Sequence, residues 1–155
     1  MPEAGYTVVE STVKPRLVAG VRAHVARGRI GLEFRRYLDQ VYAAAGEGSV
    51  QLDGENIFIY RECIGDQLTV DFCVGARGPF APLGEVQPLH TPGGVAAMTT
   101  HQGDYGRLYA ANAAVSAWCR AHDRQLAGPS WEVYGHWHAD PAQLRTDVYY
   151  LLQQP

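Results

Sequence analysis

The chain has 155 residues, of which 46% are hydrophobic and 19% are charged, and its formal net charge is −3. This composition supports a packed core in one domain or in two small halves, and it excludes a disordered chain. A mildly acidic chain without a basic run is a poor candidate for direct binding of nucleic acid or of an anionic membrane. The sequence offers neither a secretory signal nor an apolar run of the ~20 residues that cross a bilayer, so we expect a cytoplasmic protein.

The first half of the chain alternates β-type runs with one amphipathic helix. From Ile30, apolar residues recur at steps of three and four, which predicts a helix that ends at Gly46 or Gly48. A short connection containing Gly65 joins the last two strands and indicates a hairpin. The predicted strands are Tyr6–Ser11, Arg16–His24, Asn56–Cys63 and Gln67–Gly75.

The second half repeats this order after a linker rich in Gly and Pro. Helical spacing runs from Tyr105 to about Arg124, and Asp104 is placed to cap the N-terminus of that helix. The predicted strands are Val86–Leu89, Gly94–His101, Trp131–His138 and Arg145–Leu152.

The shared order β-β-α-β-β suggests an internal duplication, with halves of about 1–78 and 86–155. Gly54 then aligns with Gly128, Tyr60 with Tyr134, and residues 70–72 with residues 148–150. On this alignment Glu132 stands where the first half has Phe58. We expect an α+β fold in which two such halves pair about a pseudo-twofold axis.

The stretch from Gly128 to His138, GPSWEVYGHWH, is the most informative part of the chain. Side chains alternate between the two faces of a strand, so Glu132 and Tyr134 share one face, and Trp131 and Val133 share the other. A carboxylate in such a strand is costly to bury unless a positive or hydrogen-bonding group meets it. Glu132 is therefore the leading candidate for a functional residue; the alternative is an exposed glutamate, or one paired with Arg145 or Arg107.

Three local patterns together resemble the GyrI-like small-molecule-binding domain, which is also the effector-binding module of AraC- and MerR-type multidrug-responsive regulators. They are TPGG leading into GDY and a helix from Thr91, GPSWEVY from Gly128, and RTDVYY from Arg145. The resemblance covers nearly the whole chain as a single domain, 1–155. It implies duplicated βαββ halves, an antiparallel sheet carrying two main helices, and a ligand cleft near the pseudo-twofold axis.

The resemblance also implies a function. It predicts a protein that binds lipophilic, often cationic or aromatic compounds in an aromatic cleft around a buried glutamate, here Glu132. Some members that stand alone hydrolyse cyclopropane-containing DNA-alkylating natural products, so the alternative is a hydrolase in which Glu132 activates water and Tyr149 assists. A protein partner, gyrase or a separate regulator, is implied by family analogy alone. Because no helix-turn-helix segment flanks the domain, we do not expect this chain by itself to control transcription.

Aromatic residues around Glu132 are candidate walls of the cleft, because their rings bury apolar area and attract cations. For several of them a place in the ordinary core is the competing interpretation, which is the better one for Tyr109. The predicted ligand-binding residues are Glu132, Trp131, Tyr105, Tyr149, Tyr109 and Trp137.

A cofactor or metal is not expected. His136 and His138 point the same way on the predicted strand, and with His101 or His90 they are one candidate zinc site. No cysteine or carboxylate completes a recognised ligand spacing, so solvated or hydrogen-bonded histidines are the better interpretation. The glycines near residue 93 form no phosphate-binding motif.

Overall fold

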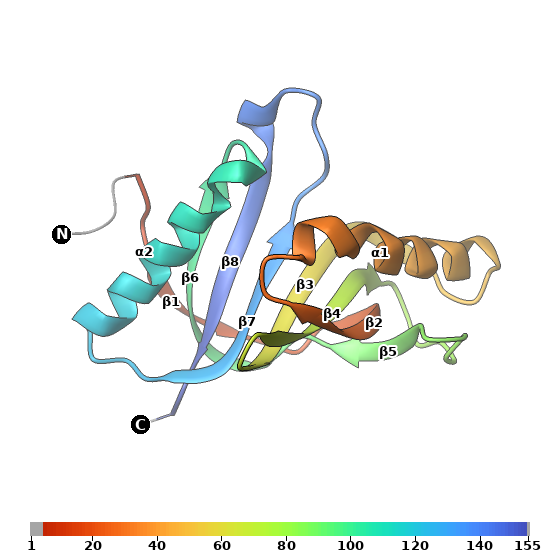
Figure 1. The fold of residues 1–155 in the computed structure, drawn as a ribbon, viewed down its shortest axis with the longest axis horizontal. Coiled ribbons are helices and arrows are strands. Elements are labelled where there is room, and N and C mark those ends of the chain that lie inside the picture. Colours follow the sequence, from red (N-terminus) through yellow and green to blue (C-terminus); the bar gives the residue numbers. More distant parts are fainter. Residues whose placement is uncertain (1–4, 155) are drawn as a thin grey trace. The chain divides into compact units, whose positions relative to one another are not determined.

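In the computed structural model, which describes residues 5–154, the chain has an α+β fold with two α-helices and eight strands in the described part (Figure 1). All strand pairs within its two compact units are antiparallel. One unit runs from Pro15 to Thr91, and the other combines residues up to Lys14 with those from Pro92 onward. None of the described helices is both long and apolar enough to cross a lipid bilayer.

The contiguous unit, Pro15–Thr91, is a four-stranded sheet with one helix. Helix α1 (Ile30–Gly46) packs on two of its strands, and Phe34, Tyr37, Phe58 and Phe72 form a cluster of rings beneath the helix. The strand order is β3-β4-β2-β5. The strands are β2 (Leu17–Ala26), β3 (Leu52–Ile64), β4 (Gln67–Ala76) and β5 (Gln87–His90).

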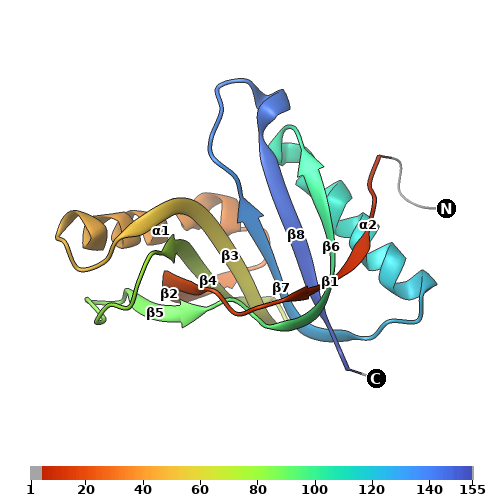
Figure 2. The ribbon, with the colours of Figure 1, turned by 180° about the vertical axis from the view of Figure 1, so that it is seen from behind.

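The second unit is built in the same way, with the strand order β1-β6-β8-β7. Helix α2 (Leu108–Ala121) packs on β6 and β8, as the views from both sides show (Figures 1 and 2). Its core is formed by Ala97, Leu108, Ala111, Val115, Cys119, Val148 and Leu152. The strands are β1 (Val9–Val13), β6 (Gly94–Gln102), β7 (Leu126–Tyr134) and β8 (Arg145–Leu152), and short 3-10 helices occupy η1 (Tyr105–Arg107) and η2 (Pro141–Gln143).

The edge strands are exchanged relative to the sequence order. Strand β1 pairs with β6 of the later half, Val9 opposite Met98, and β5 pairs with β2 of the earlier half, His90 opposite Leu17. Each unit therefore consists of a continuous β-α-β-β segment plus one strand, β5 or β1, from the other half of the sequence. The predicted halves 1–78 and 86–155 instead assign β1 to the first half and β5 to the second.

Strand registers show the duplication directly. Strands β3 and β7, each at one end of the strand order in its unit, each carry a bulge at an equivalent position, between Leu52 and Asn56 and between Leu126 and Ser130. Phe58 lies opposite Phe72, and Glu132 lies opposite Val148. The alignment of residues 70–72 with 148–150 was therefore wrong by two residues, because Phe72 corresponds to Val148.

Several predicted element bounds were wrong, most clearly those of β7 and α2. The strand predicted at Trp131–His138 is β7, which runs from Leu126 to Tyr134. The Gly135 N–H makes one more bond across to β8, to the carbonyl oxygen of Arg145 (2.8 Å), and residues 135–140 form a loop. The predicted helix from Tyr105 begins with the 3-10 turn η1, which Asp104 caps, and α2 ends at Ala121. By contrast, α1 from Ile30 to Gly46 and β8 from Arg145 to Leu152 are confirmed.

Candidate functional site

Glu132 lies in β7 on the sheet face that carries α2. It is 6% exposed, which contradicts the alternative of a glutamate exposed on the strand. The Tyr134 hydroxyl donates a 2.6 Å hydrogen bond to Oε1, and the Asn112 side-chain amide donates a 3.1 Å hydrogen bond to Oε2. Arg145, a predicted ion partner, instead bonds Asp147 at 3.2 Å. The carboxylate is thus buried and hydrogen-bonded, as a buried charge requires.

Asn112 links helix α2 to the sheet. Its amide also donates to the carbonyl oxygen of Leu108 (3.2 Å), and its Oδ1 accepts a hydrogen bond from the Tyr150 hydroxyl (2.8 Å). Burial raises the pKa of Tyr150, a side-chain hydrogen bond with Ser116 lowers it, and the nearby Glu132 charge raises it. The four side chains of Tyr150, Asn112, Glu132 and Tyr134 therefore form one hydrogen-bonded chain.

Tyr105 completes this cluster from the loop before α2. Its ring packs edge-on against Tyr134, with centroids 5.5 Å apart, and it is 36% exposed. Asp104 holds the turn by accepting a hydrogen bond from the Gly106 N–H at 3.1 Å. Of the predicted aromatic residues, Tyr105 is the one that the structure places beside the Glu132 network.

Trp131 and Tyr149 form a separate pair. They lie opposite each other on β7 and β8, one residue out of phase with Glu132, so they occupy the other face of the sheet. Their rings stack at 5.0 Å with an angle of 6°. The tyrosines hydrogen-bonded into the Glu132 network are Tyr134 and Tyr150, which were not among the predicted site residues.

Tyr109 and Trp137 are mostly exposed, at 73% and 74%, so neither lies in the core. Trp137 belongs to the loop after β7 and not to the strand. Two sequence signals were available for the residues that prediction missed. Tyr134 follows Glu132 by two in a strand, and Asn112 is a polar residue within the apolar stripe of the helix.

The histidines of the candidate zinc site do not form a cluster. His101 is 4% exposed, and its Nδ1 and Nε2 lie 2.6 Å from the Tyr6 hydroxyl and 2.9 Å from the Asp104 carbonyl oxygen. A carbonyl only accepts, so Nε2 carries the proton and Nδ1 accepts from Tyr6. His136 and His138 are exposed in the loop after β7. Within residues 5–154 no three His, Cys, Asp or Glu side chains are grouped to hold a metal ion.

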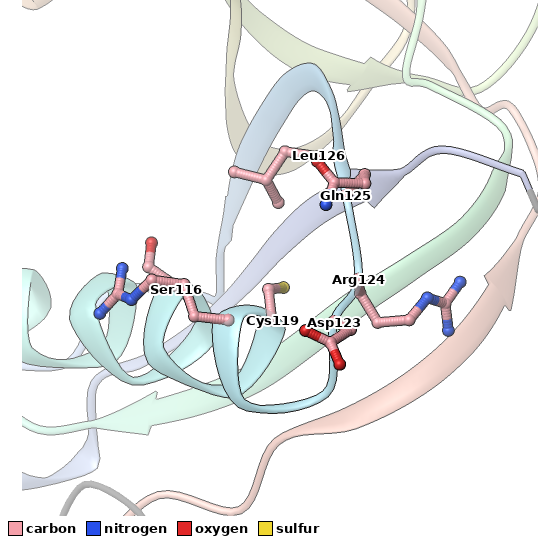
Figure 3. A pocket seen from close by; sticks show the side chains of 7 residues that line it. Ser116, Cys119, Asp123, Arg124, Gln125 and Leu126 are labelled. Atoms are coloured by element: carbon pink, nitrogen blue, oxygen red, sulfur yellow. The ribbon is translucent and has the colours of Figure 1, made fainter.

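A hollow of about 490 Å³ lies between the C-terminal end of α2 and the start of β7 (Figure 3). It contains none of the predicted site residues. Two arginines, Arg120 and Arg124, and one carboxylate, Asp123, line it, and Arg124 also pairs with Glu10. The full lining is Ser116, Cys119, Arg120, Asp123, Arg124, Gln125 and Leu126.

The sequence profile of the GyrI-like small molecule binding domain matches residues 7–153. The chain belongs to this family. No protein of curated function matches it by sequence. The family resemblance drawn from the three motifs is therefore confirmed.

Solved structures with the same fold include those of EcmrR. The chain is 16% identical to EcmrR in its complex with DNA, with a TM-score of 0.79. The match covers 97% of this chain and 58% of the EcmrR chain. Against the isolated C-terminal domain of EcmrR the TM-score is 0.76 at 16% identity, covering 97% of this chain and 99% of that one. The GyrI-like chain thus spans less than two thirds of the EcmrR chain seen on DNA.

Two further structures share the fold. SAV2435, solved with bound tetraphenylphosphonium, is 9% identical with a TM-score of 0.72, covering 95% of this chain and 94% of its own. A hydrolase from Listeria innocua is 12% identical with a TM-score of 0.62, covering 94% and 91%. At these identities the likeness concerns the fold.

Proposed function

We propose that this GyrI-like protein binds lipophilic aromatic cations at Glu132. The observation that carries the proposal is a 6% exposed carboxylate set among tyrosine rings. A carboxylate at this depth attracts a cation more strongly than one in water: at 4 Å the attraction is about 4 kcal/mol where the effective dielectric constant is ~20, against about 1 kcal/mol in water. Tyrosine faces add cation–π attraction, and the structure of SAV2435 with tetraphenylphosphonium provides a precedent within the fold.

The test compares a charged ligand with a neutral one of similar shape. Tetraphenylphosphonium and triphenylphosphine oxide are titrated by calorimetry into the wild type and Glu132→Gln. We expect the substitution to weaken the cation at least tenfold, about 1.4 kcal/mol, and to leave the neutral compound within twofold. Arg120→Ala is the control, because it changes the hollow at the end of α2 and leaves Glu132 intact. Equal losses for both ligands, or a cation effect confined to Arg120→Ala, would contradict the proposal.

A second candidate is hydrolysis of reactive electrophiles such as cyclopropanoid compounds. The 2.6 Å hydrogen bond between Tyr134 and Glu132 supports it, because the pair offers a base and an acid side by side. Glu132 would take a proton from water while the water oxygen forms a bond to one cyclopropane carbon. The ring C–C bond breaks, and its electron pair takes up the proton of the Tyr134 hydroxyl at the other carbon. Transfer of the proton from Glu132 to Tyr134 restores both groups. Tyr134 replaces Tyr149 in this proposal, since Tyr149 lies on the opposite face of the sheet.

Product mass separates the two candidates. A cyclopropane-bearing electrophile incubated with a hydrolase yields a product heavier by one water, made by the wild type and not by Glu132→Gln. Tyr149→Phe serves as the matched control and is expected to keep the rate, whereas Tyr134→Phe is expected to lower it. Thermal stabilisation by the compound without any product indicates binding alone.

A further inference from the structure

Thr146 carries a buried hydroxyl with no hydrogen-bond partner. Thr146 is 0% exposed. Among the buried side-chain oxygen and nitrogen atoms of residues 5–154, its Oγ1 is the one that lacks a hydrogen-bond partner. Leaving such a group unsatisfied destabilises the folded protein. Buried polar groups without partners are uncommon enough in folded proteins that each asks for a reason.

The hydroxyl lies on the same sheet face as Glu132. In the strand register, Thr146 is directly opposite Tyr134 on one side and His101 on the other. Both neighbours are already engaged: the Tyr134 hydroxyl donates to Glu132, and both nitrogens of His101 are bonded. Neither neighbour bonds Thr146 Oγ1, which is therefore available to a group from outside this row.

The other unit shows what a structural residue looks like at this position. By strand register Thr146 corresponds to Val70, which is 0% exposed and lies opposite Ala23 and Tyr60. His101 corresponds to Ala23 and Glu132 to Phe58, so the equivalent rows are almost entirely apolar. Since valine fills this place in the duplicated sheet, the fold does not require the threonine hydroxyl.

We propose that Thr146 contacts the ligand of the Glu132 site and selects protonated amines over quaternary cations. This inference rests on the proposed cation-binding function. Thr146 and Glu132 are diagonal neighbours on adjacent strands, ~7–8 Å apart at the backbone. In this proposal one ammonium group donates one N–H to the carboxylate and another to Oγ1, in hydrogen bonds of ~2.9 Å. A quaternary cation has no N–H to give.

Entry to this row requires a covering side chain to move. Tyr105, which is 36% exposed, packs edge-on against Tyr134 of this row and belongs to a single 3-10 turn. Changes of side-chain rotamer at a binding surface are common when a partner binds.

The experiment uses two cations that differ in their N–H groups. They are 3,3-diphenylpropylamine, protonated at neutral pH, and its N,N,N-trimethyl derivative, with tetraphenylphosphonium as the reference for the proposed function. Each is titrated by calorimetry into the wild type, Thr146→Val and Thr146→Ser. We expect Thr146→Val to weaken the primary amine about tenfold, to leave both quaternary cations within twofold, and to leave the unliganded protein as stable or more stable. Thr146→Ser, which keeps the hydroxyl, retains the preference.

The contrary outcomes are distinct. If tetraphenylphosphonium binds through Glu132 and Thr146→Val changes all cations equally, the proposed function stands and the role of Thr146 falls. A loss of stability in unliganded Thr146→Val with unchanged affinities assigns the hydroxyl to a buried water, which also overturns the proposal. If no cation binds the wild type, both fall together.

Discussion

Glu132 occupies a position at which the two similar units carry different residues, a carboxylate in one and an aromatic ring in the other. Its counterpart Phe58 is equally buried, at 6% exposed, and packs among Phe34 and Phe72. Glu132 at the same position is held by Tyr134 and by Asn112 of α2. Replacing buried polar groups by well-packed apolar ones is often neutral or stabilising, so retention of a carboxylate here is better explained by a ligand than by stability.

Tyr150 gives this cluster a measurable dependence on pH. Its pKa in the folded protein lies above the ordinary value of 10.0, mainly because of burial. A phenol whose folded pKa is raised contributes stability that is complete below pH 10 and is lost as the pH rises through the folded pKa. We expect Tyr150→Phe to lose about 1–3 kcal/mol at pH 8, since Asn112 Oδ1 loses its donor.

The measurement is the free energy of unfolding in urea between pH 8 and 11. The gap between the wild type and Tyr150→Phe is expected to shrink towards pH 11, because only the wild type ionises this phenol on unfolding. Other tyrosines with raised pKa, including Tyr6 and Tyr105, titrate in both proteins and cancel. A gap that stays constant with pH would contradict the assignment.

Single residues were predictable from the sequence where local pattern sufficed. The alternation in β7 correctly placed Glu132 and Trp131 on opposite faces. It did not reveal that Tyr149 follows Trp131 to the far face, because this depends on the register between β7 and β8. Asn112 and Tyr150 reach Glu132 only through the packing of α2 on the sheet, which no local pattern encodes.

At the scale of elements, the two 3-10 turns form a natural comparison. Asp104 caps η1 by accepting from the Gly106 N–H (3.1 Å), and Asp140 caps η2 by accepting from the Ala142 N–H (3.0 Å). Only η1 carries a ring, Tyr105, that packs on the Glu132 network. The two caps therefore make the same kind of hydrogen bond, but only the Asp104 cap holds a turn that carries an aromatic ring of the Glu132 network.

We expect Asp104→Ala and Asp140→Ala each to lower stability by about 0.5–2 kcal/mol. Asp104→Ala is also expected to weaken tetraphenylphosphonium severalfold, because Tyr105 loses its fixed position, whereas Asp140→Ala leaves the affinity unchanged. Thermal denaturation and calorimetric titration of both variants provide the two readouts. Equal affinities in the two variants would remove Tyr105 from the site.

Elements were well predicted where the sequence period was sustained and poorly where it was interrupted. The start of α1 at Ile30 follows from a long stripe of apolar residues. The end of β7 was missed because Gly-His-Trp-His continues the alternation of the strand, although the hydrogen bond from Gly135 to Arg145 already closes the pairing. The start of α2 was missed because the residues of η1 fit helical spacing.

For the whole molecule, the exchange of β1 and β5 predicts which pieces of the chain can fold. A fragment of residues 15–91 contains a complete four-stranded unit, whereas a fragment of residues 1–78 has almost the same length but lacks β5 and carries β1 without β6. We expect fragment 15–91 to show more protected amides by hydrogen exchange and greater resistance to proteolysis than fragment 1–78. Equal protection would contradict the division into these units.

This exchange was not predictable from the sequence. The order β-β-α-β-β repeats in both halves and leaves open which partner each outer strand takes. The choice depends on pairings between residues far apart in the chain, such as Val9 with Met98. Local periodicity, which supplied the helices and most strands, contains no information about it.

The pairing of β1 with β6 also determines when β1 can find its partner during synthesis of the chain. A ribosome adds roughly 5–20 residues per second, so β1 is synthesised roughly 4–18 s before Met98, its partner in β6. During that interval the unit from Pro15 to Thr91 can close on itself, while β1 remains an unpaired strand. Such an edge is open to wrong partners. The unit that holds Glu132 is completed last, when β8 arrives, so the carboxylate is buried only after nearly the whole chain exists.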